Sequence, residues 1–448
     1  MPIPTYIINL AKRTDRKAHV LNEFDGRKAF LPVLTNAIEH ETGAFGLWKT
    51  LIKVIKQQEK NDRDYIILCE DDHMFSADYT DEILYRSIKQ ADALGADILC
   101  GGVSWFSNGL GISPELIWVE RFSGLQFTVI FRRFFKKLLC AHFSDGDAAD
   151  TKISQLTKNK YCMFPFTSVQ KDFGYSDVTV RNNYVGRVGQ LFVNSRIKAG
   201  AVSYITNHYK RTKYKVSHHL FFSQKPIPLL VLNREDKTDN REVVARHFSQ
   251  QKEFEVNVDF FKDFNTRNEQ WRAIQTAIKN AESQSAEMVV LCWDDYVFSS
   301  DYTPKALMQS IRSAYQVGAE ILCCGLTNFD IAIPIHPGQI WLSSFSNPGV
   351  LVIFKSLFHK LENLSLDREM SVELLLSRST SYKTLGFPLL FNHNEAVIKD
   401  QIAHADKTFF SAEDYRDPEL RIKLVQQISD LVATVDLNET AHLDKQAL

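Results

Sequence analysis

The feature that most constrains how this chain can fold is an internal repeat. The segment YIILCEDDHMFSADYT at 65–80 reappears as MVVLCWDDYVFSSDYT at 288–303, which is a shift of 223 residues. The same shift relates GADILCGG at 95–102 to GAEILCCG at 318–325, and no gap is needed between these segments. A repeat of this extent predicts two copies of one structural unit, each with a core of its own.

The repeat also predicts the domain organisation. At 448 residues the chain is long enough for roughly two or three domains. We expect a first domain over residues 1–225, a second over 226–410 and a charged helical C-terminal tail over 411–448. The joint would fall near Lys225-Pro226, after the polar and basic stretch NHYKRTKYKVSHH.

Strand-like and helix-like patterns alternate within each copy. In the first copy, an apolar run at 6–9 precedes a helix-like segment whose apolar residues, from Trp48 to Ile55, recur at i, i+3, i+4 and i+7. The β-rich run YIILC, a second helix and the strand-like DILC come next. This alternation predicts an α/β fold with a mainly parallel sheet flanked by helices. Ligands of such sheets bind at the carboxyl ends of the strands, where residues 9–16 and 70–72 would lie.

Composition and charge exclude several classes of protein. With 53 Lys+Arg against 54 Asp+Glu, the net charge of -1 gives no overall field that would favour nucleic acid. The start, MPIPTYIINLAKRTDRK, lacks the apolar region of a signal peptide, and no run is long enough to span a bilayer. The seven cysteines show no CxxC pair, which suits reduced thiols. These observations predict a cytoplasmic protein whose membrane contact, if any, is peripheral.

Three consecutive carboxylates, Glu70, Asp71 and Asp72, directly follow an apolar strand. Like charges held together repel, so the arrangement favours a bound cation. Oxygen ligands select Mg²⁺ or Mn²⁺, which usually complete their coordination with substrate phosphates and water. We expect Glu70 and Asp72 to face the metal and Asp71 to turn toward backbone amides or a sugar hydroxyl of a diphosphate-linked ligand. A solvated acidic turn that caps the next helix remains the alternative.

Four blocks of the first copy occur together in the order usual for one family. They are the opening IINLAKRTDR, the glycine pair Gly43 and Gly46 before a helix, the LCEDD turn, and FP…SVQ…YSDV at 164–178. Over residues 5–180 the chain resembles glycosyltransferase family 25, the lipopolysaccharide-biosynthesis and collagen-galactosyltransferase group. The resemblance implies two tandem domains of the GT-A fold. It also implies inverting transfer of a sugar from a nucleotide-diphosphate donor to a glycan or protein acceptor.

The resemblance also assigns residues to the donor site. Asn9, Arg13 and Arg16 would lie in the donor-nucleotide loop, where arginine can pair with diphosphate oxygens. Gln170 and Asp177 occupy the family's Q…SD pattern and would contact donor or acceptor hydroxyls. For the two arginines, surface ion pairs with Asp15 or a neighbouring helix are the alternative.

A general base is also implied. Asp150 matches an acid of the family and is the first candidate for the base that takes the acceptor proton, with Asp147 in reserve. The alternative for Asp150 is a residue at the N-terminus of the helix TKISQL. His73 and the later His208 are weaker candidates for a further metal ligand, as are His218 and His219.

The sequence departs from the family at two places. The Ser-His pair that the family usually carries after the two glycines is replaced, because this chain reads GAFGLWKTL at 43–51. In the second copy Trp293 replaces Glu70 before Asp294 and Asp295, and a tryptophan cannot ligate a metal. We therefore expect the first copy to be catalytic and the second to be degenerate, although Glu373 keeps an acid in place of Asp150.

Two rival functions stay open from the sequence. One is a non-catalytic protein that binds nucleotide sugars or carbohydrate, which the missing Ser-His pair favours. The other is a nucleotidyltransferase, which shares the α/β plan and the acidic turn but usually has a glycine-rich, basic N-terminal signature that is absent here. Release of nucleoside diphosphate, binding alone, and release of pyrophosphate would distinguish the three.

Overall fold

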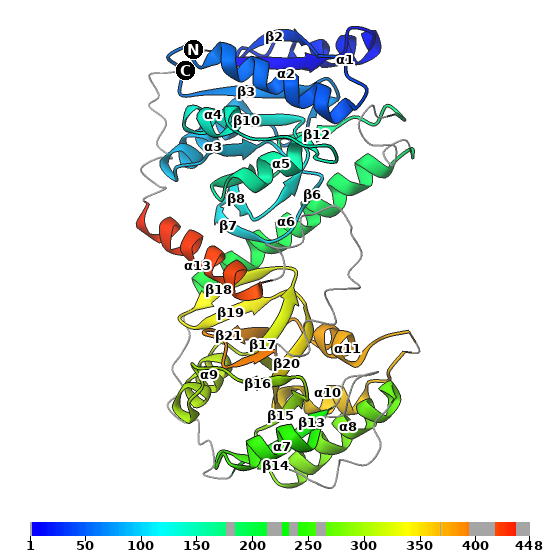
Figure 1. The fold of residues 1–448 in the computed structure, drawn as a ribbon, viewed down its shortest axis with the longest axis vertical. Coiled ribbons are helices and arrows are strands. Elements are labelled where there is room, and N and C mark those ends of the chain that lie inside the picture. Colours follow the sequence, from blue (N-terminus) through cyan, green and yellow to red (C-terminus); the bar gives the residue numbers. More distant parts are fainter. Residues whose placement is uncertain are drawn as a thin grey trace. The chain divides into compact units, whose positions relative to one another are not determined.

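The computed structural model describes residues 2–175, 184–212, 226–232, 241–256, 266–367, 369–393 and 417–435. The chain divides into two compact units, Met1–His208 with Gln427–Leu448, and Tyr209–Gln426. The predicted joint at Lys225-Pro226 borders residues 213–225, which lie outside the described residues. Each unit contains one large sheet (Figure 1).

The sheet of the first unit has the strand order β2-β1-β3-β10-β5-β11-β8-β7. Its strands are β1 (Ile3–Asn9), β2 (Phe30–Asn36), β3 (Tyr65–Glu70), β5 (Ile98–Cys100), β7 (Gly109–Ser113), β8 (Leu116–Val119), β10 (Phe127–Phe131) and β11 (Lys160–Met163). Strands β10 and β8 run against the others, so the sheet is mainly parallel in direction. Short pairs are formed by β4 (His73–Phe75) with β12 (Ser168–Gln170) and by β6 (Trp105–Phe106) with β9 (Phe122–Ser123).

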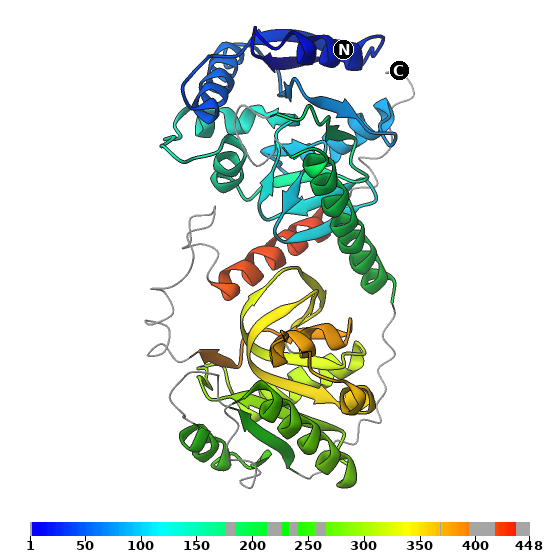
Figure 2. The same cartoon turned by 90° about the vertical axis from the view of Figure 1, so that its right-hand side faces the viewer.

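The helices of the first unit follow from apolar periodicity and capping. They are α1 (Thr14–Phe24), α2 (Gly43–Gln58), α3 (Asp81–Ala93), α4 (Arg132–Leu139), α5 (Ala149–Leu156) and α6 (Arg187–Arg211). In α2 the predicted stripe is buried at Trp48, Leu51 and Ile55. Helix α3 begins at a threonine cap, because Thr80 accepts the N–H of Ile83. The long helix α6 lies across β6 and β7 (Figure 2).

The sheet of the second unit has the matching order β14-β13-β15-β20-β17-β21-β19-β18, and β20 and β19 are again the reversed strands. Its strands are β13 (Ile227–Leu232), β14 (Phe254–Val256), β15 (Met288–Trp293), β17 (Ile321–Phe329), β18 (Ala332–His336), β19 (Gln339–Leu342), β20 (Phe345–Phe354) and β21 (Lys383–Gly386). A short pair joins β16 (Tyr296–Phe298) to β22 (Phe391–His393). Positions 223 residues apart fall in matched strands, as Cys69 in β3 and Cys292 in β15 do.

The core of the second unit has two layers, one on each face of its sheet. Alternate residues of β15 enter different clusters, with Leu291 in one and Val290 in the other, as the pleat of a strand requires. The remaining helices are α7 (Arg241–Ser249), α8 (Arg267–Ser283), α9 (Pro304–Gln316), α10 (Phe358–Asn363), α11 (Val372–Ser379) and α13 (Pro418–Thr434), with a 3₁₀ turn at Lys355–Leu357. Apolar residues of α8, α10 and α11 cover one face, and those of α7 and α9 cover the other.

The predicted fold class is confirmed at the level of two α/β halves, each with a mainly parallel sheet flanked by helices. One detail of the prediction is wrong. Gly43 and Gly46 do not precede a helix but lie in the first turn of α2, and at Gly46 the preceding loop approaches too closely for a side chain. Among the described residues, no helix is both long enough and apolar enough to cross a membrane.

Candidate functional site

A cleft of about 430 Å³ lies in the first unit, at the carboxyl ends of two neighbouring parallel strands. Strands β1 and β3 are paired so that Ile8 lies opposite Glu70, which brings the loops after both strands together. The predicted residues that line the cleft are Arg16, Glu70, Asp71, Asp72, Asp150 and Gln170. Residues separated by more than 150 positions thus meet where ligands of such sheets bind.

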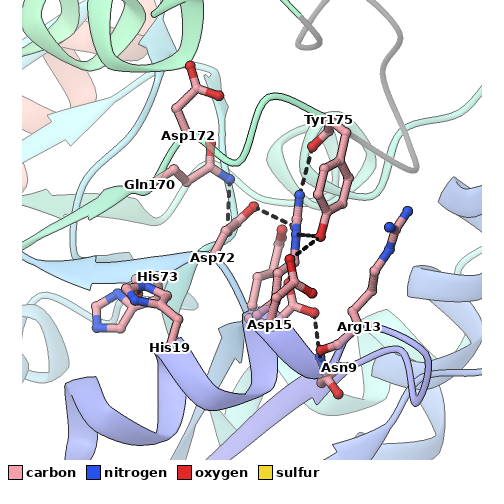
Figure 3. Close-up of polar contacts among 12 residues, drawn as sticks. Asn9, Arg13, Asp15, His19, Asp72, His73, Gln170, Asp172 and Tyr175 are labelled. Atoms are coloured by element: carbon pink, nitrogen blue, oxygen red, sulfur yellow. Dashed lines mark hydrogen bonds and ion pairs between the residues drawn. The ribbon is translucent and has the colours of Figure 1, made fainter. Parts of the chain in front are cut away.

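Asp71 and Asp72 of the acidic turn share Arg16 as a partner, and each has one further partner of its own. Asp71 accepts hydrogen bonds from Asn9 Nδ2 at 2.8 Å and from Arg16 Nη1 at 3.1 Å, so it faces the loop after β1. Asp72 accepts from Arg16 Nη1 at 3.2 Å and from Gln170 Nε2 at 3.4 Å. Figure 3 shows Asp72 between Gln170 on one side and Tyr175 with its contacts on the other. Asp71 therefore has a positioning role, while Asp72 lies at the centre of the polar network.

Arg16 is an internal counter-ion of this turn and not a surface arginine. It is only 9% exposed, and it bridges Asp71 and Asp72. Its Nη2 also donates to the backbone oxygen of Tyr175 at 2.8 Å, and its guanidinium lies over the Tyr175 ring, 4.6 Å from the ring centre. Burial lowers the pKa of Arg16, but the charges of Asp72 and Asp71 outweigh burial and raise that pKa above its usual value. The side chain stays cationic.

The cleft holds more negative charge than Arg16 can balance. Burial raises the pKa of Glu70 well above its usual value, and the charges of Asp72, Asp150 and Asp71 raise it further. Burial also raises the pKa of Asp72 to about 6, against the opposing effect of Arg16. Acidic side chains outnumber basic ones in the lining of the cleft, and such a surplus of carboxylates favours an additional cation.

Asp150 also lines the cleft, and it lies within the first turn of α5. Its Oδ2 accepts the Ser123 hydroxyl at 2.5 Å and the Gly124 N–H at 2.9 Å, and its Oδ1 accepts the Thr151 N–H at 2.7 Å. Helix α5 has Ala148 at its N-cap and no side-chain cap bond, so Asp150 is not the capping residue. Gly124 has φ +111°, a conformation that favours glycine, and the loop it forms fixes the carboxylate.

Other predicted residues lie outside the lining of the cleft. Asn9 is buried beneath Asp71, and Arg13 lies over the ring of Tyr175 at 4.0 Å. Asp147 is paired with Lys152 at 3.0 Å and does not line the cleft. Of the two candidate bases, only Asp150 lines it. Asp177 lies outside the described residues, as do His218 and His219.

The two described histidines that the sequence offered as metal ligands, His73 and His208, do not line the cleft. His73 is fully buried, and its Nδ1 is hydrogen-bonded to Ser168 Oγ at 2.8 Å. Its ring stacks with that of Phe127, with 5.1 Å between the ring centres. Burial lowers the pKa of His73 to about 3, so this ring is neutral. His208 lies exposed on α6 and stacks with Tyr204. Among the described residues, no three His, Cys, Asp or Glu side chains form a ready metal site.

Several cleft residues were missed by sequence reasoning. Tyr175 holds Arg16 through both its hydroxyl and its backbone oxygen, and Ser123 anchors Asp150. Lys171 and Asp172 also line the cleft. Tyr175, Lys171 and Asp172 all lie in the 164–178 block, so the pattern indicated the segment but not which of its side chains matter.

The matching position of the second unit has no such cleft chemistry. Trp293 ends β15, is 1% exposed and belongs to the apolar core that α8, α10 and α11 cover. Asp294 and Asp295 after it are buried, at 4% and 2% exposure. Trp118 is buried as well, and Trp341 is 8% exposed, so both are core residues and not platforms for sugars.

Comparisons with known proteins identify no family for this chain. No family model and no curated protein matches this chain. Among solved structures, A197 from STIV is similar with a TM-score of 0.27 and 15% identity, over 40% of this chain and 87% of that chain. UDP-glucose pyrophosphorylase complexed with UDP-glucose is similar with a TM-score of 0.27 and 7% identity, over 43% of this chain and 100% of that chain. A likeness of this extent does not assign a function, which has to be argued from the cleft.

Proposed function

We propose that the first unit is a metal-dependent glycosyltransferase that moves a sugar from a nucleotide-diphosphate donor to a glycan or protein acceptor. The observation that carries the proposal is the cleft at the ends of β1 and β3, because Glu70, Asp72 and the candidate base Asp150 all line it. Surplus carboxylate charge at this edge of an α/β sheet supports a site for a cation and a diphosphate. The resemblance of residues 5–180 to glycosyltransferase family 25 supports the same reaction.

The residues fit a divalent metal. Glu70 and Asp72 would hold Mn²⁺ or Mg²⁺, because both supply hard oxygen ligands and both have a pKa raised by burial and by neighbouring carboxylates. When bound, such an ion neutralises the negative charge that develops on the leaving diphosphate. Since Asp71 is engaged with Asn9 and Arg16, the remaining ligands would come from the diphosphate and from water.

The resemblance to glycosyltransferase family 25 implies that the reaction is a single displacement. Asp150 would accept the proton of the acceptor hydroxyl, and the hydroxyl oxygen would then attack the anomeric carbon. The bond from that carbon to the diphosphate oxygen breaks, so the configuration inverts and the nucleoside diphosphate leaves. Ser123, Gly124 and Thr151 hold the carboxylate in one orientation for this role.

Release of nucleoside diphosphate from UDP- and GDP-sugars, with and without Mn²⁺, tests the proposal. We expect Mn²⁺-dependent release from at least one donor, and we expect Asp72→Asn and Asp150→Asn to lower it at least 100-fold, the scale that general acid-base groups contribute. Asp78→Asn is the matched control, because Asp78 lies outside the cleft and pairs with Arg196. Binding of donors without turnover would favour the non-catalytic alternative, and release of pyrophosphate would favour a nucleotidyltransferase.

A further inference from the structure

Four lysines form a stripe along the exposed face of α2. Lys49, Lys53, Lys56 and Lys60 follow one another at i, i+4, i+7 and i+11, so they project from one side of the helix and its end. All four are exposed, and none forms an ion pair with a described residue. Between Lys49 and Lys56 the stripe is about 10 Å long at the helical rise of 1.5 Å per residue.

The stripe borders a groove of about 790 Å³ with an apolar floor. Ile38 and Ile52 contribute the floor, and the four lysines line its edges. Ile38 also lines the cleft that contains the acidic turn, so the groove and the cleft meet at this residue. A ligand that lies in the groove would therefore have one end beside the reacting centre.

The contact between α2 and the loop before it fixes the position of Ile38 beside the groove. The N–H of Ile38 donates to Thr50 Oγ1 at 2.8 Å, and a Cβ at Gly46 would lie 2.4 Å from the Ile38 carbonyl oxygen. Only glycine lets the loop approach the helix this closely. The floor of the groove is thus set by the fold of α2 and the loop before it.

The second copy does not keep the stripe. The four matched positions in α8 are Arg272, Thr276, Lys279 and Ser283, so two of the four cations are absent. The complete stripe occurs in the copy that has the complete acidic turn. This association links the lysines to the use of the cleft.

We propose that the α2 groove binds the acceptor, and that the acceptor is an oligosaccharide that carries phosphate or carboxylate groups. The inference rests on the proposed function, and it adds the class of acceptor. Sugar rings pack on apolar surfaces, and anionic substituents complement lysines that have no acidic partner. The alternative of an anionic bilayer is disfavoured, because no large apolar side chain of α2 is among the exposed ones.

Direct binding to the full-length protein without donor tests the inference independently of turnover. The probes are phosphopentamannose and the same pentamannose after removal of its phosphate, measured by calorimetry at low and at physiological salt. We expect the phosphorylated probe alone to bind, and to bind more weakly as salt screens the charges. Lys53→Gln/Lys56→Gln should weaken binding about tenfold, the scale of two exposed charge pairs. Lys136→Gln/Lys137→Gln on α4, also exposed and outside the groove, should leave it unchanged.

Each outcome decides the inference. Equal binding of both pentamannoses, equal effects of the two double variants, or no binding would overturn it. Stronger retention on vesicles of phosphatidylglycerol than on the phosphorylated glycan would overturn it in favour of a membrane. If donor turnover is absent but the lysine-dependent glycan binding is present, the proposed transferase fails and the groove stands as a site for anionic glycans. If turnover is present and glycan binding is absent, only the groove fails.

Discussion

At the scale of single residues, the cleft is marked by charge that the fold does not balance. Glu70 has no hydrogen-bonding or ion-pairing side chain among the described residues, and the single guanidinium of Arg16 bonds to Asp71 and Asp72. A group placed for stability alone would not be buried with a pKa as far raised as that of Glu70. Binding of a cation would offset the free energy that it costs to ionise Glu70 in this place.

This imbalance predicts that Asp72→Asn makes the protein more stable while it removes function. Burial raises the pKa of Asp72 from 3.8 to about 6, so the ionised form at pH 7 costs about 3 kcal/mol relative to a neutral one. We expect the variant to raise the free energy of unfolding of the first unit by about 1 to 3 kcal/mol, measured by urea denaturation at pH 7. Mn²⁺ with UDP should raise the melting temperature of the wild type and not of the variant.

The control for this prediction is Asp78→Asn, which removes a partly exposed carboxylate from an ion pair with Arg196. It should change the free energy of unfolding by less than about 1 kcal/mol and leave the response to Mn²⁺ with UDP unchanged. A less stable Asp72→Asn variant that still responds to Mn²⁺ would contradict the assignment of the acidic turn.

At the scale of elements, the position of α2 depends on Gly46. In Gly46→Ala the new methyl would lie 2.4 Å from the Ile38 carbonyl, which is backbone and must therefore shift. We expect a loss of about 1 to 3 kcal/mol in the free energy of unfolding. Gly189→Ala in α6 is the matched control, because no atom lies within 4 Å of the added methyl and alanine favours helix. It should be neutral or stabilising by up to about 1 kcal/mol.

Strand β11 carries a buried lysine that predicts a pH dependence of stability. Burial lowers the pKa of Lys160 from 10.5 to about 7. Between these values the unfolded chain binds more protons than the folded one, so the contribution of Lys160 to stability rises with pH and its full cost applies below pH 7. Lys160→Met should therefore stabilise the first unit below pH 7, by about 4 kcal/mol once about 1 kcal/mol for the lost bond to the Thr157 oxygen is subtracted.

The measurement is the difference in free energy of unfolding between Lys160→Met and wild type from pH 6 to pH 9. We expect this difference to fall by about 2 kcal/mol between pH 7 and pH 9. Lys136→Met, at an exposed position on α4, should give a difference that stays constant across this range. A constant difference for Lys160→Met would show that its amine is not neutral in the folded protein. The matched Lys383, whose pKa burial lowers to about 8, offers the same test in the second unit.

The elements were easier to predict than the contacts between them. Apolar periodicity and the acidic end of YIILC were sufficient to place β3, α2 and the turn at Glu70, because these depend on local patterns. The pairing of Arg16 with Tyr175 joins positions 159 apart, and no local pattern carries that information. The same holds for Ser123, whose bond to Asp150 becomes visible only when β9 and α5 are packed together.

At the scale of the whole molecule, one fold occurs twice with different use. The two sheets share strand order and direction, so the second unit retains the architecture that forms the cleft in the first. What differs is the end of the third strand in each order, Glu70 of β3 against Trp293 of β15. A carboxylate that lines the cleft is replaced by an indole that packs into the core. The second unit thus keeps the fold without an acid at this position.

We therefore predict that the second unit does not catalyse transfer, because its apolar core is built around Trp293 at the position of the acid Glu70. An indole offers a hard cation no charge and no lone pair, and Trp293 is buried in the core with Leu291 and Leu342.

In a protein whose first unit is inactivated by Asp72→Asn, no Mn²⁺-dependent release of nucleoside diphosphate should remain. Restoring the acid by Trp293→Glu should not rescue activity. It should destabilise the second unit by more than about 3 kcal/mol, because it buries a carboxylate in an apolar core and leaves a cavity. The control Trp293→Phe should cost less and leave activity unchanged. If Mn²⁺-dependent turnover survives Asp72→Asn and is then abolished by Asp295→Asn, the second unit is an enzyme and the assignment to the first unit alone is wrong.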